Sequence, residues 1–506
     1  MKLMKNTGEK MKQNKRPFIL FAIMLAMFVS AVEATIVATV MPGIVADLGG
    51  FSLFSWVFSA YLLMQVMTIP IYGKLSDMYG RKIIFSIGMF FFLVGSLLCG
   101  FSTSMEMLII ARLVQGLGAG AVQPMATTIV GDIYTKEERA NIQGYLSSVW
   151  GISAVAGPLL GALIVSYFHW AWVFWVNIPL GIMAVILILV YLKEPVTKEK
   201  RQIDYSGAIL LLTAILPVML LFIQTGISWS WKEPIFWILI LISCLSFGLF
   251  LRQEKRAKEP IMTLSLWREK EVWVSNIASF TTGAVLLAIS SFLPTFVQGA
   301  LLATPLVAGL TLTVISIGWP LSAMIAGKLM IKLGFRKTAL IGGISFVIGS
   351  AWYSLLHFLP YPLLAGFGSF FIGMGMGFMT TTFIVMIQSN VPWKLRGEAT
   401  SLNLFMRQLG GSVGVAFLGG LLNFQIKRSL ESNQDQLSIE PSLDSISSLL
   451  EGGEETTISA FEQGIIQQGL SSGYLLLFSM IGVLAVISLL FVLFLPKKKP
   501  EKDLAQ

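Results

Sequence analysis

A single acidic residue stands inside the first long apolar run of the chain. Residues 18–42 read FILFAIMLAMFVSAVEATIVATVMP, and Glu33 is the only charged residue among them. An ionisable side chain at membrane depth is costly unless it is paired, hydrated or protonated. The structural alternative is that Glu33 lies near a helix end and reaches the lipid headgroups. This is a weak alternative, because Glu33 precedes Met41 by eight residues, about 12 Å of helix at 1.5 Å per residue. We therefore predict that Glu33 is a titrating or ligand-pairing carboxylate.

Two arginines also lie within apolar runs. Arg112 follows Glu106 by six residues, about 9 Å along a helix, which is a depth similar to that of Glu33. A structural role for Arg112, capping neighbouring carbonyl groups, is the alternative to a functional one. Arg407 is nine residues into its run, too deep for easy snorkelling. Contact with substrate or the coupling site and pairing with a lipid headgroup both stay open for Arg407.

The composition identifies the class of protein. The 506-residue chain is 55% hydrophobic and 12% charged, which excludes an ordinary soluble domain. The apolar segments are long and do not alternate every second residue, so they predict membrane helices and not the strands of a barrel. Basic residues precede the first run as in a signal peptide, but this run is too long and carries a charge, so we expect an uncleaved span.

Fourteen apolar windows are predicted to span the membrane. They cover residues 18–41, 52–72, 83–102, 106–130, 141–166, 170–192, 205–225, 233–251, 271–297, 303–326, 338–358, 361–387, 398–422 and 470–495. Most of the 36 basic residues fall in alternate connections and in the two tails, the pattern of cytoplasmic loops. Both termini are therefore expected in the cytoplasm, and the net charge of +9 needs no nucleic-acid partner.

The chain contains an internal repeat of six spans. Residues 73–82, GKLSDMYGRK, recur in decayed form at 327–337, and the glycines of 116–120 recur at 373–377. Membrane transporters are often built from such repeats. The predicted parts are a tail (1–17), a first six-helix bundle (18–192), a linker (193–204), two inserted helices (205–251), a linker (252–270), a second six-helix bundle (271–495) and a tail (496–506). Within the second bundle, the polar, acidic segment 423–469 is either a helical hairpin at the outer surface or a disordered loop.

The residue types argue against several kinds of site. Cys99 and Cys244 lie in apolar runs, and the two histidines, His169 and His357, are far apart in sequence, so we expect neither a disulfide nor a metal site. A nucleophile–base pairing is not recognisable, and the G-x4-G-K-[ST] phosphate-binding sequence is absent from the chain. We therefore expect neither an enzyme nor an ATP-driven motor, and no cofactor.

Polar residues inside the apolar windows are candidates for lining a substrate cavity. Besides Glu33 and Arg407, they are Gln65, Gln115, Gln123, Asn177, Gln298 and Asn403. Any one of them is more often a helix–helix hydrogen bond worth about 1–2 kcal/mol or less. The many Phe and Met residues suit packing and lipid contact, and a fraction facing a cavity would suit loose recognition of apolar molecules.

Three of these sequence features resemble the major facilitator superfamily. Residues 73–82 match its signature between spans two and three, G-x-L-x-D-x-x-G-R-K/R, at every defined position. Residues 112–120 resemble the span-four motif whose arginine is tied to proton coupling. Residues 151–161 resemble the span-five antiporter motif of exporters, with Gly151, Gly157, Pro158 and Gly161 at the motif positions. Small residues there let two helices pack closely.

Three further segments are similar to the family of fourteen-span drug–proton antiporters. Residues 32–42 (VEATIVATVMP) are similar to its first-span signature, residues 169–181 (HWAWVFWVNIPLG) to its sixth-span segment, and residues 407–414 (RQLGGSVG) to its pattern in span thirteen. Together with the superfamily motifs, the resemblance covers nearly the whole chain. It implies an all-α membrane protein with two six-helix bundles plus two inserted helices.

The resemblance also implies roles for the charged residues. Spans one and four line the cavity of the first bundle in this superfamily, so Glu33 and Arg112 are expected to approach closely and to couple protonation with transport. Asp77 of the loop motif, with Gly73, Gly80 and Arg81, is implied to pair across the two halves and to hold an inner gate shut. A solvated ion pair is the alternative, since exposed salt bridges are weak.

This sequence departs from the family pattern in three places. Aspartate is usual in the first span, where this chain has the longer Glu33, and Ile331 stands at the offset that corresponds to Asp77. A second carboxylate deep in the later spans, present in some multidrug relatives, is not found, which puts recognition of divalent cations in doubt.

The function favoured by these features is proton-coupled export of hydrophobic drugs or other toxic compounds by alternating access. A monomer in the plasma membrane of a bacterium is expected, with a hydrophobic or cationic small molecule, protons and the lipid bilayer as its partners. Export of a specific metabolite, siderophore or lipid by the same fold is the alternative. A membrane enzyme or a channel is less consistent with two homologous halves and gate motifs.

Overall fold

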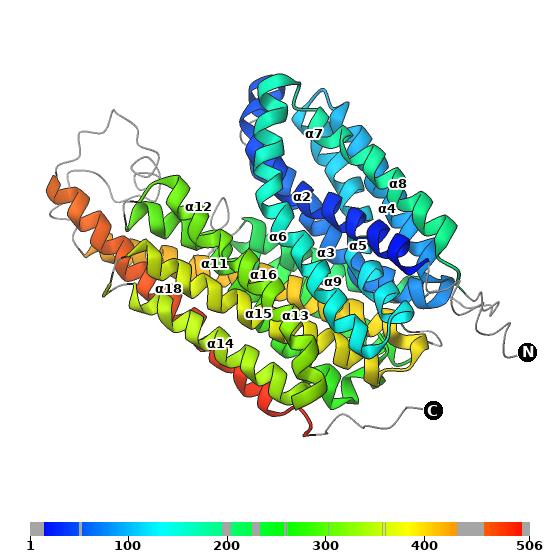
Figure 1. Ribbon diagram of the computed structural model, residues 1–506. Helices are drawn as coiled ribbons and strands as arrows, with labels where there is room; N and C mark the ends of the chain where they lie inside the picture. Colours follow the sequence, from blue (N-terminus) through cyan, green and yellow to red (C-terminus); the bar gives the residue numbers. More distant parts are fainter. Residues whose placement is uncertain are drawn as a thin grey trace, which may run out of the picture. The chain divides into compact units, whose positions relative to one another are not determined.

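The computed structural model is shown in Figure 1. It describes residues 15–49, 53–194, 204–224, 233–257, 260, 262–301, 303–356, 358–359, 361–432 and 460–497. Within these ranges the chain forms α-helices and short 3-10 helices, and the described part contains no strand. The predicted all-α class is therefore confirmed.

A helix lies at each of the expected spans. In the first half of the chain the helices are α2 (Arg16–Leu48), α3 (Phe54–Tyr79), α4 (Arg81–Gly100), α5 (Met105–Ile133), α6 (Lys136–Tyr167), α7 (Trp172–Trp175) and α8 (Asn177–Tyr191). The two helices that the sequence predicts as an insert are α9 (Tyr205–Gln224) and α10 (Pro234–Glu254), followed by the 3-10 helix η2 (Leu264–Arg268). The second half contains α11 (Lys270–Gly299), α12 (Pro305–Thr313), α13 (Ile315–Leu333), α14 (Phe335–Leu355), α15 (Pro362–Asn390), η3 (Trp393–Leu395), α16 (Arg396–Glu431) and α18 (Ala460–Leu493).

Among the described residues, twelve segments are long and apolar enough to cross a membrane. The other two expected spans lie on α6 and α9, and some residues of both helices fall outside the part whose side chains are described. The count of fourteen spans therefore stays a prediction. The predicted hairpin at 423–469 lies partly outside the described residues, and its two flanks belong to α16 and α18.

Local sequence signals explain several helix ends. Helix α6 begins with a capping box, in which the Thr135 side chain accepts from the Glu138 amide and the Glu138 carboxylate accepts from the Thr135 amide. Gly80 and Gly334 separate consecutive helices at φ values of 96° and 82°, a backbone region that favours glycine. These two glycines occupy corresponding positions of the internal repeat, so both copies make the same turn.

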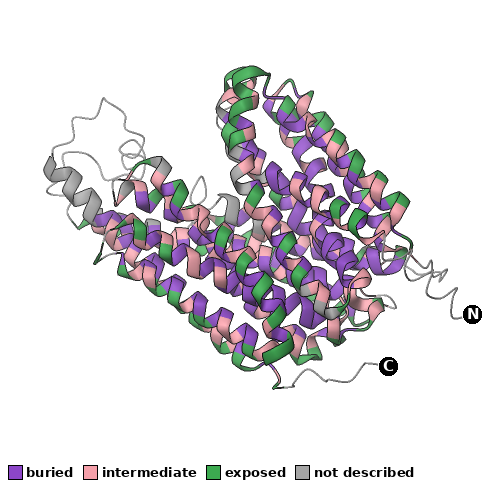
Figure 2. Ribbon diagram, in the orientation of Figure 1, coloured by how far each residue is buried: buried purple, intermediate pink, exposed green. Residues whose placement is uncertain are grey.

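The chain divides into two compact units. Unit 1 comprises Met1–Pro217, Leu241–Trp273 and Thr381–Phe405. In this unit α5 packs against α3 and α4, and α2 packs against α6 and α8. Most of α5 is buried, as its colouring in Figure 2 shows. This central position places the side chains of α5 among those of α2, α3 and α4.

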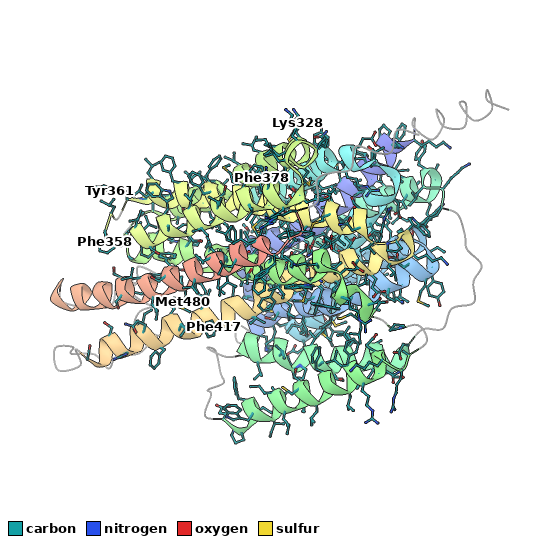
Figure 3. The ribbon with its side chains drawn as sticks, turned by 90° about the horizontal axis from the view of Figure 1, so that it is seen from below. Lys328, Phe358, Tyr361, Phe378, Phe417 and Met480 are labelled. Carbon is teal, nitrogen blue, oxygen red and sulfur yellow. The ribbon has the colours of Figure 1, made fainter. Side chains whose placement is uncertain are left out.

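Unit 2 comprises Val218–Ile240, Val274–Thr380 and Met406–Gln506. Its apolar core includes the stacked rings of Tyr353 and Phe478, whose centroids are 5.4 Å apart. Figure 3 shows exposed Phe358 and Tyr361 together where α14 leads into α15, and Lys328 of α13 toward the other end of α14. Aromatic residues at one end of a span suit a membrane–water interface.

The same glycine contacts occur in both units. Gly118 of α5 packs on the Gly88 carbonyl of α4, and Gly375 of α15 packs on the Gly342 carbonyl of α14. A β-carbon at either glycine would collide with the facing helix, so both positions need glycine for close approach. The internal repeat predicted from the sequence thus has a matching three-dimensional register.

Candidate functional site

The centre of unit 1 holds a buried carboxylate. Glu33, in the middle of α2, has 0% of its surface exposed. Its Oε1 atom is 2.5 Å from Nη1 of Arg112 on α5. Its Oε2 atom accepts a hydrogen bond of 2.6 Å from Nδ2 of Asn177, the first residue of α8. Three helices therefore converge on one side chain.

Arg112 is held on several sides. Its Nε donates to the Val57 carbonyl at 3.0 Å, and its Nη1 donates to Gln115 Oε1 at 2.7 Å. Its guanidinium carbon lies 4.3 Å from the centre of the Tyr61 ring, within the range of a cation–π interaction. Arg112 thus caps a neighbouring carbonyl and pairs with Glu33 at the same time, so both sequence interpretations describe part of its environment.

Ser96 of α4 completes the polar cluster. Its hydroxyl oxygen accepts from Gln115 Nε2 at 2.7 Å and lies 3.4 Å from Asn177 Nδ2. The Cys99 thiol lies 3.8 Å from Gln115 Oε1. Glu33, Ser96, Gln115 and Asn177 are all buried. A buried network with its members paired fixes each side chain, because an unpaired one would cost free energy.

The local sequence explains why Asn177 reaches this cluster. The sixth expected span is interrupted at Val176, between α7 and α8. Pro179 follows in the first turn of α8, where proline is tolerated because its missing N–H would have no helical acceptor. The interruption places Asn177 at the start of a helix inside the bundle.

Glycines bring the helices of the cluster close together. Gly95 of α4 lies against the backbone of Gln115, and Gly157 of α6 lies against Thr35 and Ile36 of α2. Gly161 also faces Ile36. Two residues of the predicted antiporter motif therefore pack on α2 within one turn of Glu33. The side chain of Pro158 lies outside the described residues.

The donors around Glu33 fit an ionised carboxylate. Arginine has only donors, and an amide nitrogen only donates, so both oxygens of Glu33 act as acceptors. A proton arriving on Glu33 would displace Arg112 or Asn177 from one oxygen. Because Glu33 and Arg112 have 0% and 1% of their side-chain surface exposed, a proton or ligand reaches them only after the surrounding helices separate.

A second charged cluster surrounds Asp77 near the end of α3. Asp77 Oδ1 accepts from the Gly397 amide at 3.0 Å, and Oδ2 accepts from the Glu398 amide at 2.7 Å. These amides belong to the first turn of α16, where unpaired N–H groups and the helix dipole favour an anion. Arg81 Nη2 lies 2.7 Å from Asp77 Oδ1. Asp77 thus joins a helix of the first half of the sequence to one of the second half.

Arg81 connects further acids to this cluster. Its Nε lies 3.0 Å from Asp132 Oδ2, and its guanidinium stacks on the Trp393 ring at 4.3 Å. The Glu194 carboxylate accepts from the backbone amides of Arg81 and Lys82 at 2.7 and 3.0 Å. Arg81 is 1% exposed. The cluster is therefore buried and not a solvated surface pair.

Glu398 links the linker after the inserted helices to the same region. Its carboxylate accepts from the amide and, at 3.0 Å, from the hydroxyl of Thr263. Lys74 Nζ lies 3.5 Å from Glu398 Oε2. Thr263 directly precedes η2. The segment that follows α10 is thereby attached to the ends of α3 and α16.

The other candidates from the sequence lie on α3, α5, α11 and α16. Gln65 and Asn403 are buried, and Gln123 is partly buried. Gln298 belongs to unit 2 and donates to the Pro294 carbonyl of its own helix at 3.4 Å. Arg407 is buried in unit 2. The structure therefore brings Gln115 and Asn177 to the Glu33–Arg112 pair.

Sequence reasoning missed several partners. Ser96 gave no signal, because serine is common in membrane helices, and Glu398 stands at the edge of its apolar window. Asp132 and Glu194 lie at helix ends where acids are ordinary. Among the described residues, no group of three or more His, Cys, Asp or Glu side chains is placed to hold a metal ion.

Comparison with known proteins agrees with this architecture. Residues 23–415 match the family model described as Major Facilitator Superfamily. The chain is 36% identical over 410 residues to a protein of Bacillus subtilis named multidrug resistance protein 3, a match covering 81% of this chain and 80% of that protein. It is 32% identical over 412 residues to the multidrug transporter protein MdtP of the same organism, covering 81% and 76%.

Solved structures share the fold at low sequence identity. The human organic anion transporter MFSD10 superposes with a TM-score of 0.64 at 12% identity, over 94% of this chain and 99% of that chain. The proton:xylose symporter XylE superposes with a TM-score of 0.61 at 11% identity, over 95% of each chain. At such identities the likeness concerns the fold alone.

Proposed function

Because the chain belongs to the major facilitator superfamily, we propose that it exports hydrophobic compounds, drugs among them, in exchange for protons. The buried Glu33–Arg112 pair carries this proposal. Relatives at 36% and 32% identity bear multidrug names, which supports the class of cargo. The motifs of the fourteen-span drug–proton antiporters support antiport, with the expected orientation of both termini in the cytoplasm of a bacterial cell.

Glu33 is the proposed site of proton exchange. In the occluded arrangement its two oxygens are held by Arg112 and Asn177 at 2.5 and 2.6 Å. Opening toward the outside hydrates the pair and weakens its electrostatic attraction, so a proton can replace Arg112 on the carboxylate. Opening toward the cytoplasm lets substrate enter, and the proton leaves as Arg112 pairs with Glu33 again. Proton re-entry supplies about 2.3 kcal/mol per charge per 100 mV of membrane potential.

The Asp77 cluster is the proposed cytoplasmic gate. Asp77, Arg81 and the first turn of α16 are joined by short, buried contacts. For substrate to enter from the cytoplasm, the end of α3 must leave the first turn of α16. Formation and loss of these contacts would then alternate with the protonation of Glu33.

Export from everted membrane vesicles tests the coupling. An inside-acid pH gradient should drive uptake of a hydrophobic dye by the wild-type protein, and a protonophore should abolish it. Glu33→Gln should reduce gradient-driven uptake to the level of empty vesicles, because the amide cannot exchange a proton. Arg112 keeps its contacts with Val57, Gln115 and Tyr61, so this variant is expected to fold.

The matched control is Glu106→Gln, which removes an exposed acid from the same helix as Arg112. It should transport like the wild type. Undiminished proton-driven uptake by Glu33→Gln, or uptake that needs ATP and ignores the protonophore, would refute the proposed mechanism.

A further inference from the structure

Arg407 is a buried cation that the proposed proton site does not use. It lies on α16 and is 8% exposed. Its guanidinium carbon lies 5.9 Å from the centre of the Trp319 ring on α13. Among the residues that the structure describes, its side chain makes neither a hydrogen bond nor an ion pair. Arg112 in unit 1 is also buried but has a carboxylate, an amide and a carbonyl as partners.

Trp319 offers a second unused donor at the same place. Its indole Nε1 is buried and has no acceptor within the described part of the chain. Arginine and the indole nitrogen both donate and neither accepts. Buried donors are normally paired, so two unpaired ones side by side point to a missing acceptor.

The backbone fixes the two side chains in this relation. Gly283 of α11 lies against the Arg407 carbonyl, and Gly377 of α15 lies against the Trp319 carbonyl. A β-carbon at either glycine would collide with the facing backbone. Two close helix contacts inside unit 2 therefore hold the helices that carry Arg407 and Trp319, and the site is built on rigid elements.

The stretches of unit 2 that form α11 to α15 and the first part of α16 carry no acid to neutralise Arg407. Between residues 274 and 380, and again between 406 and 430, the chain has no Asp or Glu. The acid that precedes Arg407 in the sequence, Glu398, is engaged by Lys74 and Thr263. Arginine stays protonated in proteins, and an isolated buried charge is costly. An anion brought by a ligand would remove this cost.

We propose that Arg407 and Trp319 form a subsite for the carboxylate or sulfonate of an aromatic amphiphile. The oxyanion accepts from the guanidinium and the indole N–H, and the aromatic part of the ligand packs in the apolar interior of unit 2. The inference rests on the proposed export function and extends its cargo to zwitterionic and anionic molecules. The phosphate of an anionic lipid headgroup has the same chemistry and is the other possible source of the anion.

A pair of dyes that differ only in this charge tests the subsite. Rhodamine B carries a free carboxylate, and its ethyl ester has the same ring system without the anion. Binding of each dye to the purified full-length protein in phosphatidylcholine nanodiscs is measured by fluorescence polarisation. Arg407→Gln should weaken rhodamine B binding at least tenfold, equivalent to about 1.4 kcal/mol, and change ester binding less than twofold.

Two further variants and one control variant sharpen the result. Arg407→Lys keeps the charge and should retain most of the preference for the carboxylate dye, and Trp319→Phe should lose part of it. Lys328→Gln removes an exposed cation from the same helix as Trp319 (Figure 3) and should change neither dye. Unchanged ester binding reports that a variant is folded. If Arg407→Gln does not fold, the proposal is tested by the preference for rhodamine B over its ester in Arg407→Lys and Trp319→Phe. Arg407→Lys should retain most of this preference, and Trp319→Phe should lose part of it.

Several outcomes would overturn the proposal. These are equal loss of both dyes, no loss of either, or a wild-type protein that does not prefer rhodamine B to its ester. Adding phosphatidylglycerol to the nanodiscs distinguishes the source of the anion. If this lipid abolishes the preference of the wild type for rhodamine B over its ester, a headgroup displaces the dye at Arg407 and the substrate assignment is wrong. A wild-type protein that prefers rhodamine B to its ester but shows no proton-driven export would refute the proposed function and leave the proposed subsite standing.

Discussion

Replacing Asp77 by Asn should loosen the first turn of α16. The two carboxylate oxygens accept from the Gly397 and Glu398 amides at 3.0 and 2.7 Å. Asparagine keeps one acceptor oxygen, so one amide loses its partner, and Arg81 loses an opposite charge. Hydrogen bonds to charged groups contribute about 1.5–3 kcal/mol each. Asp132 and Glu194 stay near Arg81, so we take the total loss as about 2 kcal/mol.

Hydrogen–deuterium exchange of the full-length protein in nanodiscs measures this change. Exchange through local opening follows the opening free energy, so a loss of about 2 kcal/mol predicts roughly 30-fold faster exchange of the two amides, since 1.4 kcal/mol corresponds to a factor of ten. The increase should be confined to peptides that include the start of α16 and the end of α3.

Asp204→Asn is the matched control for this experiment. Asp204 also accepts from a backbone amide at a helix start, that of Gly207 at 2.9 Å, and from Gln253 at 3.0 Å. Both bonds end on Oδ1, which asparagine keeps, so this replacement removes a charge without removing an acceptor and should leave exchange at residues 397–398 unchanged. Exchange at 397–398 that stays within twofold of wild type in Asp77→Asn, or that rises evenly over all helices, would show that Asp77 does not hold α16.

Three further changes have definite expected results. Asn177→Leu keeps the side-chain volume but removes the donor 2.6 Å from Glu33, so proton-driven uptake should fall at least tenfold, as expected from about 1.5–3 kcal/mol for a hydrogen bond to a charged group. Gly95→Ala forces α4 away from the Gln115 backbone and should lower the free energy of unfolding by about 1–3 kcal/mol. Its unfolding temperature should be lower than that of Gly248→Ala, where the added carbon meets open space. Thr263→Val removes the hydroxyl bonded to Glu398, a loss of about 1 kcal/mol of hydrogen-bond free energy. Amide exchange over the start of η2 should therefore rise about fivefold, while exchange in α5 stays unchanged as the reference.

Depth along the helices placed Glu33 and Arg112 at a similar level, and their close approach was expected from the resemblance to the major facilitator superfamily. Both residues are isolated charges in long apolar runs, and a helix rise of 1.5 Å per residue fixes how far each lies from its end. The turn glycine Gly80 was predictable for a similar reason, because its motif demands a tight connection. Such features depend on local sequence, so they can be recognised without knowing which helices are neighbours.

Contacts between distant segments could not be predicted in this way. Lys74 and Glu398 are 324 positions apart, and Thr263 reaches Glu398 from the linker after the inserted helices. Their meeting depends on how whole helices pack. Gln298 stays a predicted cavity residue, and its side chain donates to the Pro294 carbonyl of its own helix.

The matching glycines of the two units contact the backbone of a neighbouring helix, so these contacts do not depend on which side chain that helix carries. Gly120 packs on the Gln65 carbonyl, and Gly377, at the corresponding repeat position, packs on the Trp319 carbonyl. Both copies thus keep the same backbone contact, whereas one bears a glutamine and the other a tryptophan at the contacted residue. Since the contact is made by backbone, mutation can exchange those side chains after a gene duplication without disturbing how the helices meet. Ligand preference in this architecture can therefore drift quickly while the bundle itself is inherited unchanged.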